Sequence, residues 1–188
     1  SAPLRISFLG GATDFPGWFK ENVGGVISTT INQYVHVMLS ELAPIWGTKY
    51  KFSYSKIETV STSDEIQHPL IRTCVKEYAK PDDRLSILYS SDLPGNSGLG
   101  SSSAFCGAMI LGINEYKKQE KFSRMRLAEE AIRVERELLS EAGGWQDQIA
   151  TAYGGFNHIK FFKSSFEVTP LSQKFIQDYL ENCYLIHV

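Results

Sequence analysis

Residues 93–104, with the sequence LPGNSGLGSSSA, are dominated by glycine, serine and proline. A strand-like apolar run at residues 85–89 precedes this stretch, and an apolar run with helical spacing begins at Ala104. The order of strand, glycine-rich loop and helix would place the unpaired N–H groups and the positive end of a helix dipole at the loop. The stretch therefore predicts a site for an anion, most naturally a phosphate group.

Three more kinds of loop share parts of this glycine-rich pattern. A glycine-rich turn capped by serine has a similar composition and binds nothing. A Walker loop is excluded because no Lys-Ser or Lys-Thr pair follows Gly100. A dinucleotide fingerprint is excluded because the glycine spacing is wrong and the first strand lies far upstream. The density of glycine and serine at one helix start favours phosphate binding over the simple turn.

The composition limits the classes of partner. The chain has 188 residues and a net charge of −2, so no basic excess favours nucleic acid or an anionic membrane. We find no apolar run long enough to cross a bilayer. Three widely spaced cysteines, at positions 74, 106 and 183, indicate reduced thiols in a cytoplasmic protein. The chain ends on an apolar run, so we expect residues 1–188 to be the front domain of a larger protein.

The elements are mixed without a strict alternation of strand and helix, which favours a layered α+β sandwich over a doubly wound sheet. We expect helices after Pro69, from Ser101 onward and over residues 124–142, and a polar loop over residues 59–64. We expect strands over residues 4–8, 26–31, 34–39, 50–54, 85–89, 156–161 and 184–188.

Glu135 is the first candidate for chemistry. The predicted helix over residues 124–142 has a buried stripe at Leu127, Ala131, Val134 and Leu138, and Gly143-Gly144 would end it as a C-cap. Glu135 shares the apolar face, where an unpaired carboxylate is costly to bury. Either a lysine or arginine pairs with it or a metal does, and the spacing alone leaves both open.

Asp147, Arg5 and Asp14 are further candidates with simpler alternatives. Asp147 follows Gly143-Gly144 in a predicted loop, where a carboxylate is often a cap or a solvated group. Arg5 and Asp14 flank the break at Gly10-Gly11, and an arginine on a first strand can be an ordinary surface residue.

Three blocks of the sequence together resemble the GHMP kinases, the superfamily of galactokinase, homoserine kinase, mevalonate kinase and phosphomevalonate kinase. The first is the opening strand with GGATDFP at residues 10–16, a form typical of the heptose kinase and fucokinase branch. The second is the loop at residues 94–104, and the third is VERE at residues 134–137 with GGWQDQ at residues 143–148.

The resemblance implies a two-layer fold like ribosomal protein S5 domain 2 and an ATP-dependent sugar kinase that uses Mg²⁺. It implies that Asp147 accepts the proton of the attacking hydroxyl, that Arg5 assists it, and that Ser102 and Glu135 hold the metal. The implied sugar-binding residues are Gly10, Gly11, Thr13, Asp14, Gly143 and Gly144. The implied nucleotide-binding residues are Pro94, Gly95, Asn96, Ser97, Gly98, Leu99, Gly100, Ser101, Ser102 and Ser103.

The implied reaction is phosphorylation of the anomeric hydroxyl of a heptose 7-phosphate or a related sugar. Alternatives are a kinase for fucose or galactose, a catalytically silent sugar or nucleotide sensor, and, disfavoured by the acidic balance, a nucleic-acid module. Two departures from the family pattern stand out. The family's C-terminal motif is not found within 188 residues, and Ser103 stands where alanine is common.

Overall fold

The structure is a computed structural model that describes residues 1–95, 97–119, 121–172 and 174. Within these residues, seven strands form one sheet in the order β4-β3-β5-β2-β6-β7, and β1 pairs with β2. All pairs are antiparallel except β3 with β5. The strands are β1 (Ala2–Leu9), β2 (Gly24–Glu41), β3 (Tyr50–Ser53), β4 (Ile57–Val60), β5 (Leu85–Ser91), β6 (Phe156–Phe162) and β7 (Ser165–Pro170).

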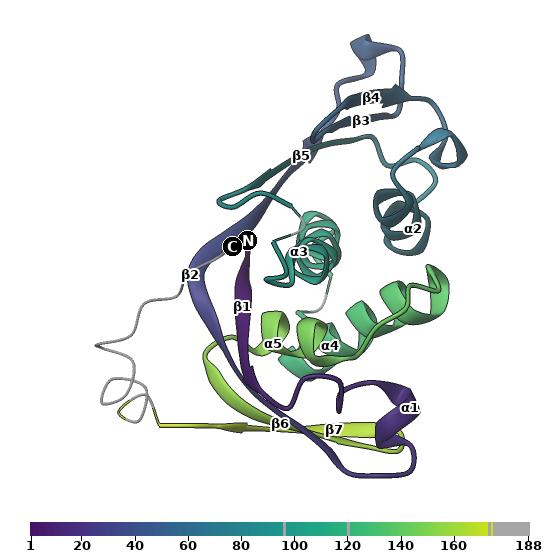
Figure 1. Ribbon diagram of the computed structural model, residues 1–188. Coiled ribbons are helices and arrows are strands. Elements are labelled where there is room, and N and C mark those ends of the chain that lie inside the picture. The colour runs from purple at the N-terminus through teal and green to yellow at the C-terminus, as the bar shows by residue number, and fades with distance from the viewer. Residues whose placement is uncertain (96, 120, 173, 175–188) are drawn as a thin grey trace.

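The helices form the second layer. Helices α2 to α5 lie on one side of the curved sheet (Figure 1). They are α1 (Pro16–Phe19), α2 (Pro69–Tyr78), α3 (Ser101–Tyr116), α4 (Arg124–Ile132) and α5 (Gln146–Tyr153), with a π-helical segment at Arg133–Leu138 and 3₁₀ turns at Pro44–Trp46 and Ser63–Glu65. The central helix α3 is buried along most of its length, and Met109 and Ile110 pack in one core with Leu4 and Val35 of the sheet. The predicted two-layer α+β fold is confirmed.

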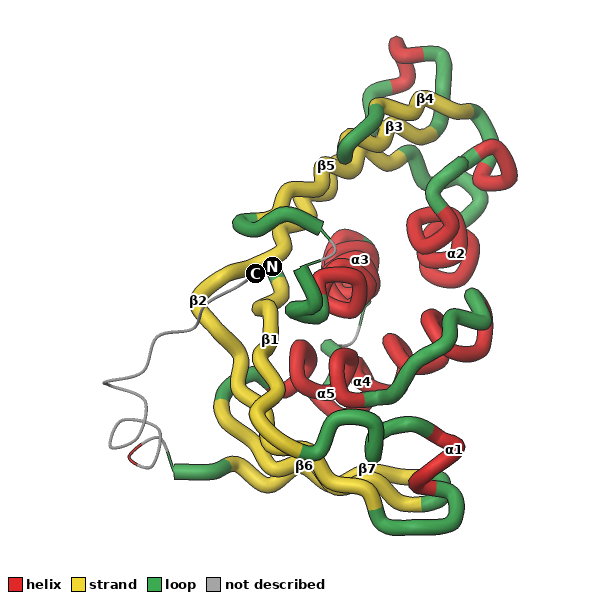
Figure 2. The backbone as a smooth tube through the Cα atoms, viewed as in Figure 1, coloured by secondary structure: helices red, strands yellow, loops and turns green. Residues whose placement is uncertain are grey.

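The sequence predicted two strands, one that ends and one that begins near Asn32, but β2 spans both. It is a single strand of 18 residues that runs the length of the sheet (Figure 2). Its pairing with β1 shifts between Pro3 and Arg5, which face Tyr34 and Thr30. The polar middle of β2 is therefore accommodated as a bulge rather than a break. Bulges re-aim side chains next to functional sites, and this one lies beside Arg5.

The predicted polar loop over residues 59–64 is also wrong in part, because β4 occupies Ile57–Val60. Glu58, on β4, is a buried carboxylate that accepts hydrogen bonds from the Tyr54 hydroxyl and from the backbone N–H groups of Gln67 and His68. These N–H groups lie just before the first residue of α2, so the hydrogen bonds of Glu58 link the edge strand β4 to that helix.

The helix predicted over residues 124–142 ends earlier than expected. It is α-helical to Ile132 and π-helical to Leu138, and the left-handed residue after it is Ser140, with φ of 54°. Gly143 and Gly144 are therefore not its C-cap. The N–H of Leu139 donates to the carbonyl of Val134, five residues back, so one residue is added to the turn. Leu138 is consequently 43% exposed, and Leu139 packs against the core in its place.

The cysteines at positions 74 and 106 are free, buried thiols, as predicted. Among the described residues, no helix has the length and apolar character needed to cross a membrane. Cys183, the expected strand at residues 184–188 and Asn96 lie outside the described residues.

The contacts of Glu58 give a prediction for stability. Burial alone would raise the pKa of Glu58, but the hydrogen bonds from Tyr54 and the two N–H groups hold this pKa below its ordinary value of 4.5. A depressed pKa stabilises the fold above the unfolded pKa, and that contribution is lost as pH falls through the folded one. We expect Glu58→Gln to lower the free energy of unfolding by about 1–2 kcal/mol at pH 7.

The test of this prediction is chemical denaturation of the wild type and the variant between pH 7 and pH 3. The difference between the two proteins should shrink below about pH 4.5, where the unfolded carboxyl becomes protonated. A difference that stays constant over this range would contradict the role of the charge.

Candidate functional site

The glycine-rich loop leads from β5 into α3, as the sequence predicts. Gly98 and Gly100 have φ of 70° and 75°, a left-handed conformation that glycine adopts without strain. Gly100, the N-cap residue of α3, makes no side-chain capping hydrogen bond, so it leaves the backbone N–H groups of the first turn available to a ligand. A Cβ added to Gly95 or Gly98 would meet no atom within 4 Å, so the loop borders open space. These features suit an anion at the start of α3.

Arg5 connects β1 to this loop and to α5. Its Nε and Nη2 lie 2.7 Å and 2.6 Å from Oδ1 of Asp147, and its Nη1 donates to the carbonyl of Gly98. Its backbone N–H donates to the carbonyl of Leu99. Arg5 is therefore not an ordinary surface arginine, because its side chain is only 12% exposed and holds the loop and a carboxylate together.

Asp147 lies in the first turn of α5, not in the loop that the sequence suggested. Nε and Nη2 of Arg5 both contact Oδ1 of Asp147, and Oδ2 has no hydrogen bond from the described residues. This second oxygen lies 3.5 Å from the position that a Cβ on Gly100 would occupy. Asp147 thus presents one carboxylate oxygen to the glycine-rich loop.

Glu135 is a buried acid beside the start of α3. It is 1% exposed and lies in the π-helical segment, facing the first turn of α3. Its Oε2 accepts from Ser103 Oγ at 2.7 Å and from the amide of Gln148, and its Oε1 accepts from Ser102 Oγ at 3.2 Å. Burial raises the pKa of Glu135, although the Ser103 and Gln148 hydrogen bonds oppose that change. No lysine or arginine pairs with it among the described residues, so the predicted ion-pair alternative is not found.

A second buried acid, Asp14, lies between the turn after β1 and the start of α5. Its Oδ2 accepts from the N–H of Gln146 at 3.2 Å, and its carbonyl accepts from the N–H of Trp145. Its Oδ1 is buried without a hydrogen-bond partner among the described residues. Burial raises the pKa of Asp14, and the charge of Asp147 acts in the same direction. The charge of Asp147 therefore makes ionisation of Asp14 less favourable.

The remaining predicted sugar-binding residues differ in how accessible they are. A Cβ on Gly11 would meet nothing within 4 Å, whereas one on Gly10 would lie 1.9 Å from the carbonyl oxygen of Gly25. The Thr13 hydroxyl donates to the carbonyl of Gly10 and accepts from the N–H of Gly25, so it holds the turn closed. Gly143 packs against the guanidinium of Arg136.

Some residues of the site were missed by the sequence analysis. Arg136 donates to the carbonyls of Glu141, Ala142 and Gly144 and so shapes the connection between Glu135 and Asp147. Gln148 follows Asp147 and contacts Glu135, and the repeated glutamine in the run WQDQ was the only signal for it. Ser103 was expected to contact phosphate, but its hydroxyl is buried against Glu135.

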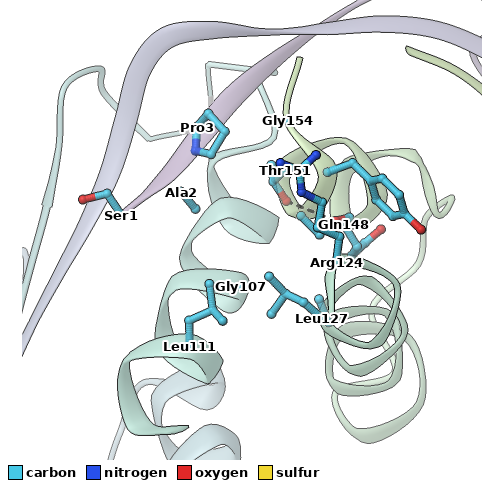
Figure 3. Close-up of a pocket in the computed structure, with 13 residues that line it drawn as sticks. Ser1, Ala2, Pro3, Gly107, Leu111, Arg124, Leu127, Gln148, Thr151 and Gly154 are labelled. Carbon is cyan, nitrogen blue, oxygen red and sulfur yellow. Dashed lines mark hydrogen bonds between the residues drawn. The ribbon is translucent and has the colours of Figure 1, made fainter. Parts of the chain in front are cut away.

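Two pockets adjoin these residues. One, of about 320 Å³, borders the glycine-rich loop and the start of α3 at Gly95, Ser101 and Ser102. Its other walls include the rings of Tyr54, His68, Tyr89 and Phe105. The second, of about 230 Å³, lies between α3, α5 and the start of β1, and Gln148 forms part of its wall (Figure 3). The first pocket could hold the base of a nucleotide whose phosphates lie on the loop, because its aromatic walls suit a planar ring.

The donor set fits a hard divalent cation. Adjacent ligands of an octahedral Mg²⁺ at about 2.1 Å lie about 3.0 Å apart, and Ser102 Oγ and Glu135 Oε1 are 3.2 Å apart. Within the described part of the chain, no three His, Cys, Asp or Glu side chains cluster as a metal site. A metal here would therefore need phosphate or water oxygens for its remaining positions, which is the usual situation for Mg²⁺.

The sequence of this chain is similar to that of a known family and of several kinases. Residues 69–155 match the family described as the GHMP kinases N terminal domain. The chain is 30% identical over 170 residues to D-glycero-alpha-D-manno-heptose 7-phosphate kinase of Campylobacter jejuni, with 86% of this chain and 50% of that protein covered. It is 28% identical over 190 residues to the bifunctional fucokinase/GDP-fucose pyrophosphorylase of Arabidopsis thaliana, with 90% of this chain and 17% of that protein covered.

A solved structure shows the same fold. The crystal structure of a D-glycero-D-manno-heptose 1-phosphate kinase from Bacteriodes thetaiotaomicron matches with a TM-score of 0.84 and 25% identity, covering 96% of this chain and 62% of that one. The chain spans half the length of the Campylobacter relative.

The close approach of Gly144 to Asp14 gives a testable prediction. A Cβ on Gly144 would lie 1.8 Å from Asp14 Oδ2, so Gly144→Ala must displace a buried carboxylate. We expect a loss of about 2–3 kcal/mol in unfolding free energy, as in other overpacked sites. Gly11→Ala is the matched control, because it enters open space and should change stability by less than about 0.5 kcal/mol. Equal effects of both substitutions in denaturant titrations would contradict the packing described here.

Proposed function

Because residues 69–155 match the GHMP kinases N terminal domain, we propose that the chain is a member of this family and forms the phosphate-binding part of an ATP-dependent kinase that phosphorylates a sugar. One observation carries the proposal. The free oxygen of Asp147 and the oxygen pair of Ser102 and Glu135 adjoin the same uncapped helix start. A proton acceptor, a metal-binding pair and an anion site are thereby brought together, and phosphoryl transfer needs these three parts.

Different residues of the site would have different roles in this reaction. The N–H groups at the start of α3 and the loop around it would bind the phosphates of ATP. Asp147 Oδ2 would accept the proton of the attacking hydroxyl. Arg5, anchored on Asp147 Oδ1, orients that carboxylate and would add positive charge beside the transferred group. Asn96 belongs to the same proposed loop.

Ser102 and Glu135 would hold Mg²⁺. When bound, a divalent cation would neutralise part of the negative charge on the phosphates. Glu135 is costly to bury as an isolated charge, which gives it a strong tendency to gain a cationic partner. Its hydrogen bonds keep the carboxylate at the start of α3 before any metal arrives.

The sugar would bind beside Asp147 and Asp14, with its attacking hydroxyl against Oδ2 of Asp147. Asp14 supports this placement because its Oδ1 lacks a partner among the described residues and suits a hydroxyl donor. Gly11 borders open space, where a ligand can approach the main chain closely. Gly143 and Gly144 pack against Arg136 and Asp14, so they would contribute by shaping the chain that leads to Asp147. Gly10 and Thr13 would contribute by holding the turn that carries Asp14.

Heptose phosphates are the favoured substrates. Two relatives are named for a heptose phosphate, one as a 7-phosphate kinase and the other as a 1-phosphate kinase. We propose phosphorylation of the anomeric hydroxyl of a heptose 7-phosphate or a related sugar. The fucokinase relative makes fucose the next candidate.

Asp147→Asn tests the mechanism in the full-length protein. It keeps the shape of the side chain but removes the proton acceptor, so we expect kcat to fall by about 10²–10⁴-fold. ATP affinity should change little, because the loop is unaltered. Asp82→Asn, which removes an exposed carboxylate from the loop after α2, is the control and should retain activity. Unchanged turnover in Asp147→Asn would refute the mechanism.

A panel of sugars tests the substrate. ADP release should depend on Mg²⁺ and be fastest with a heptose 7-phosphate, compared with a heptose 1-phosphate, fucose and galactose, and the NMR spectrum of the product should show a new anomeric phosphate. ATP binding without sugar-dependent ADP release from any of them would favour a nucleotide sensor instead.

A further inference from the structure

We propose that Ser103 and Gln148 are positioning residues that make Glu135 a one-oxygen metal ligand and thereby favour Mg²⁺ over larger cations such as Ca²⁺. The inference rests on the proposed function only in that Glu135 and Ser102 hold the metal. It concerns which atoms of Glu135 are available, and it assigns roles to two residues that do not themselves contact the ion.

The two oxygens of Glu135 have different surroundings. Oε2 accepts from two donors, Ser103 and Gln148, whose side chains come from α3 and α5 and are 3% and 0% exposed as residues. Oε1 has only the hydroxyl of Ser102, which lies at the exposed start of α3. A carboxylate held in this way on one oxygen can rotate little, so it presents Oε1 and withholds Oε2.

The orientation of the Gln148 amide is set by Glu135. Its Nε2 donates to the carboxylate, while its Oε1 is buried without a partner among the described residues. A reversed amide would place two acceptor oxygens against each other, which is worse than one unpartnered carbonyl. The Gln148 side chain forms part of the wall between the site and the pocket behind it (Figure 3). Its volume is therefore needed as well as its donor.

The chemistry of the two cations explains why one available oxygen matters. Mg²⁺ requires near-octahedral geometry with ligands at about 2.0–2.1 Å and keeps several waters, so a single carboxylate oxygen suits it. Ca²⁺ takes six to eight ligands at about 2.3–2.6 Å and often binds both oxygens of a carboxylate. Donors that occupy Oε2 therefore disfavour the ion that would use it.

Binding of metal-bound ATP, measured without any sugar, tests the proposal in the full-length protein. Equilibrium dialysis at excess metal gives the dissociation constants of Mg·ATP and Ca·ATP, and ATP with EDTA gives the metal-free reference. The variants are Ser103→Ala, Gln148→Met and the double substitution. Methionine keeps the volume of Gln148 and removes its donor. Ser28→Ala and Thr151→Val are the controls, because each removes a buried hydroxyl that does not contact Glu135.

We expect Mg·ATP to bind about tenfold more weakly to Gln148→Met, a typical cost of losing a partner of a metal ligand. Ca·ATP should weaken by a smaller factor or tighten, so that the ratio of the two dissociation constants shifts towards Ca²⁺. The double variant should shift furthest, and the controls should not shift.

Equal weakening of both complexes would reduce Ser103 and Gln148 to a structural role and overturn the proposal, as would unchanged affinities. Equal wild-type binding of ATP with Mg²⁺ and with EDTA would overturn it too, because Glu135 would then hold no metal. The proposed kinase function fails differently, when the wild type binds Mg·ATP but phosphorylates no sugar, and the selectivity measurement remains valid in that case.

Discussion

The contact between Arg5 and Asp147 is the interaction on which the site depends. It joins strand β1 to helix α5, and the two residues are 142 positions apart in sequence. The same arginine also holds the carbonyl of Gly98 and, through its backbone, that of Leu99. Since the pair is mostly shielded from solvent, its attraction is weakened less by water than that of a surface ion pair. The position of the loop relative to the acid is therefore set by one side chain.

The site shows how a chain with a net charge of −2 can build a place for an anion. The positive potential comes from backbone N–H groups at the start of α3 and from Arg5, not from a surplus of basic residues. The acids that would repel phosphate are each restrained at one oxygen. Arg5 contacts Oδ1 of Asp147, and Ser103 with Gln148 contacts Oε2 of Glu135, so each acid keeps one oxygen towards the loop. Proton acceptance and metal binding become possible there without two unpaired charges facing the phosphates.

Local patterns in the sequence predicted the parts of this arrangement that depend on neighbouring residues. The loop, the start of α3 and the burial of Glu135 follow from glycine content and helical spacing. The contacts of Glu135 did not follow, because Ser103 and Gln148 reach it from two other helices. The single strand β2 was also missed, since a polar stretch such as the one at Asn32 can be a turn or a bulge, and only its pairing with β1 decides. Asn96 stays a prediction.

The π-helical segment explains both an error in the prediction and a property of the site. Helical spacing at 3.6 residues per turn placed Leu138 in the core, but the added residue moves Leu139 there instead. Glu135 keeps its inward direction because it lies near the start of the segment. Arg136, one residue later, reaches the carbonyls of the connection that returns to α5. A regular helix continued to Ala142 would have left only three residues, 143–145, to make this return. The irregular turn therefore lets two adjacent residues reach different partners, Glu135 the start of α3 and Arg136 the connection that leads to Asp147.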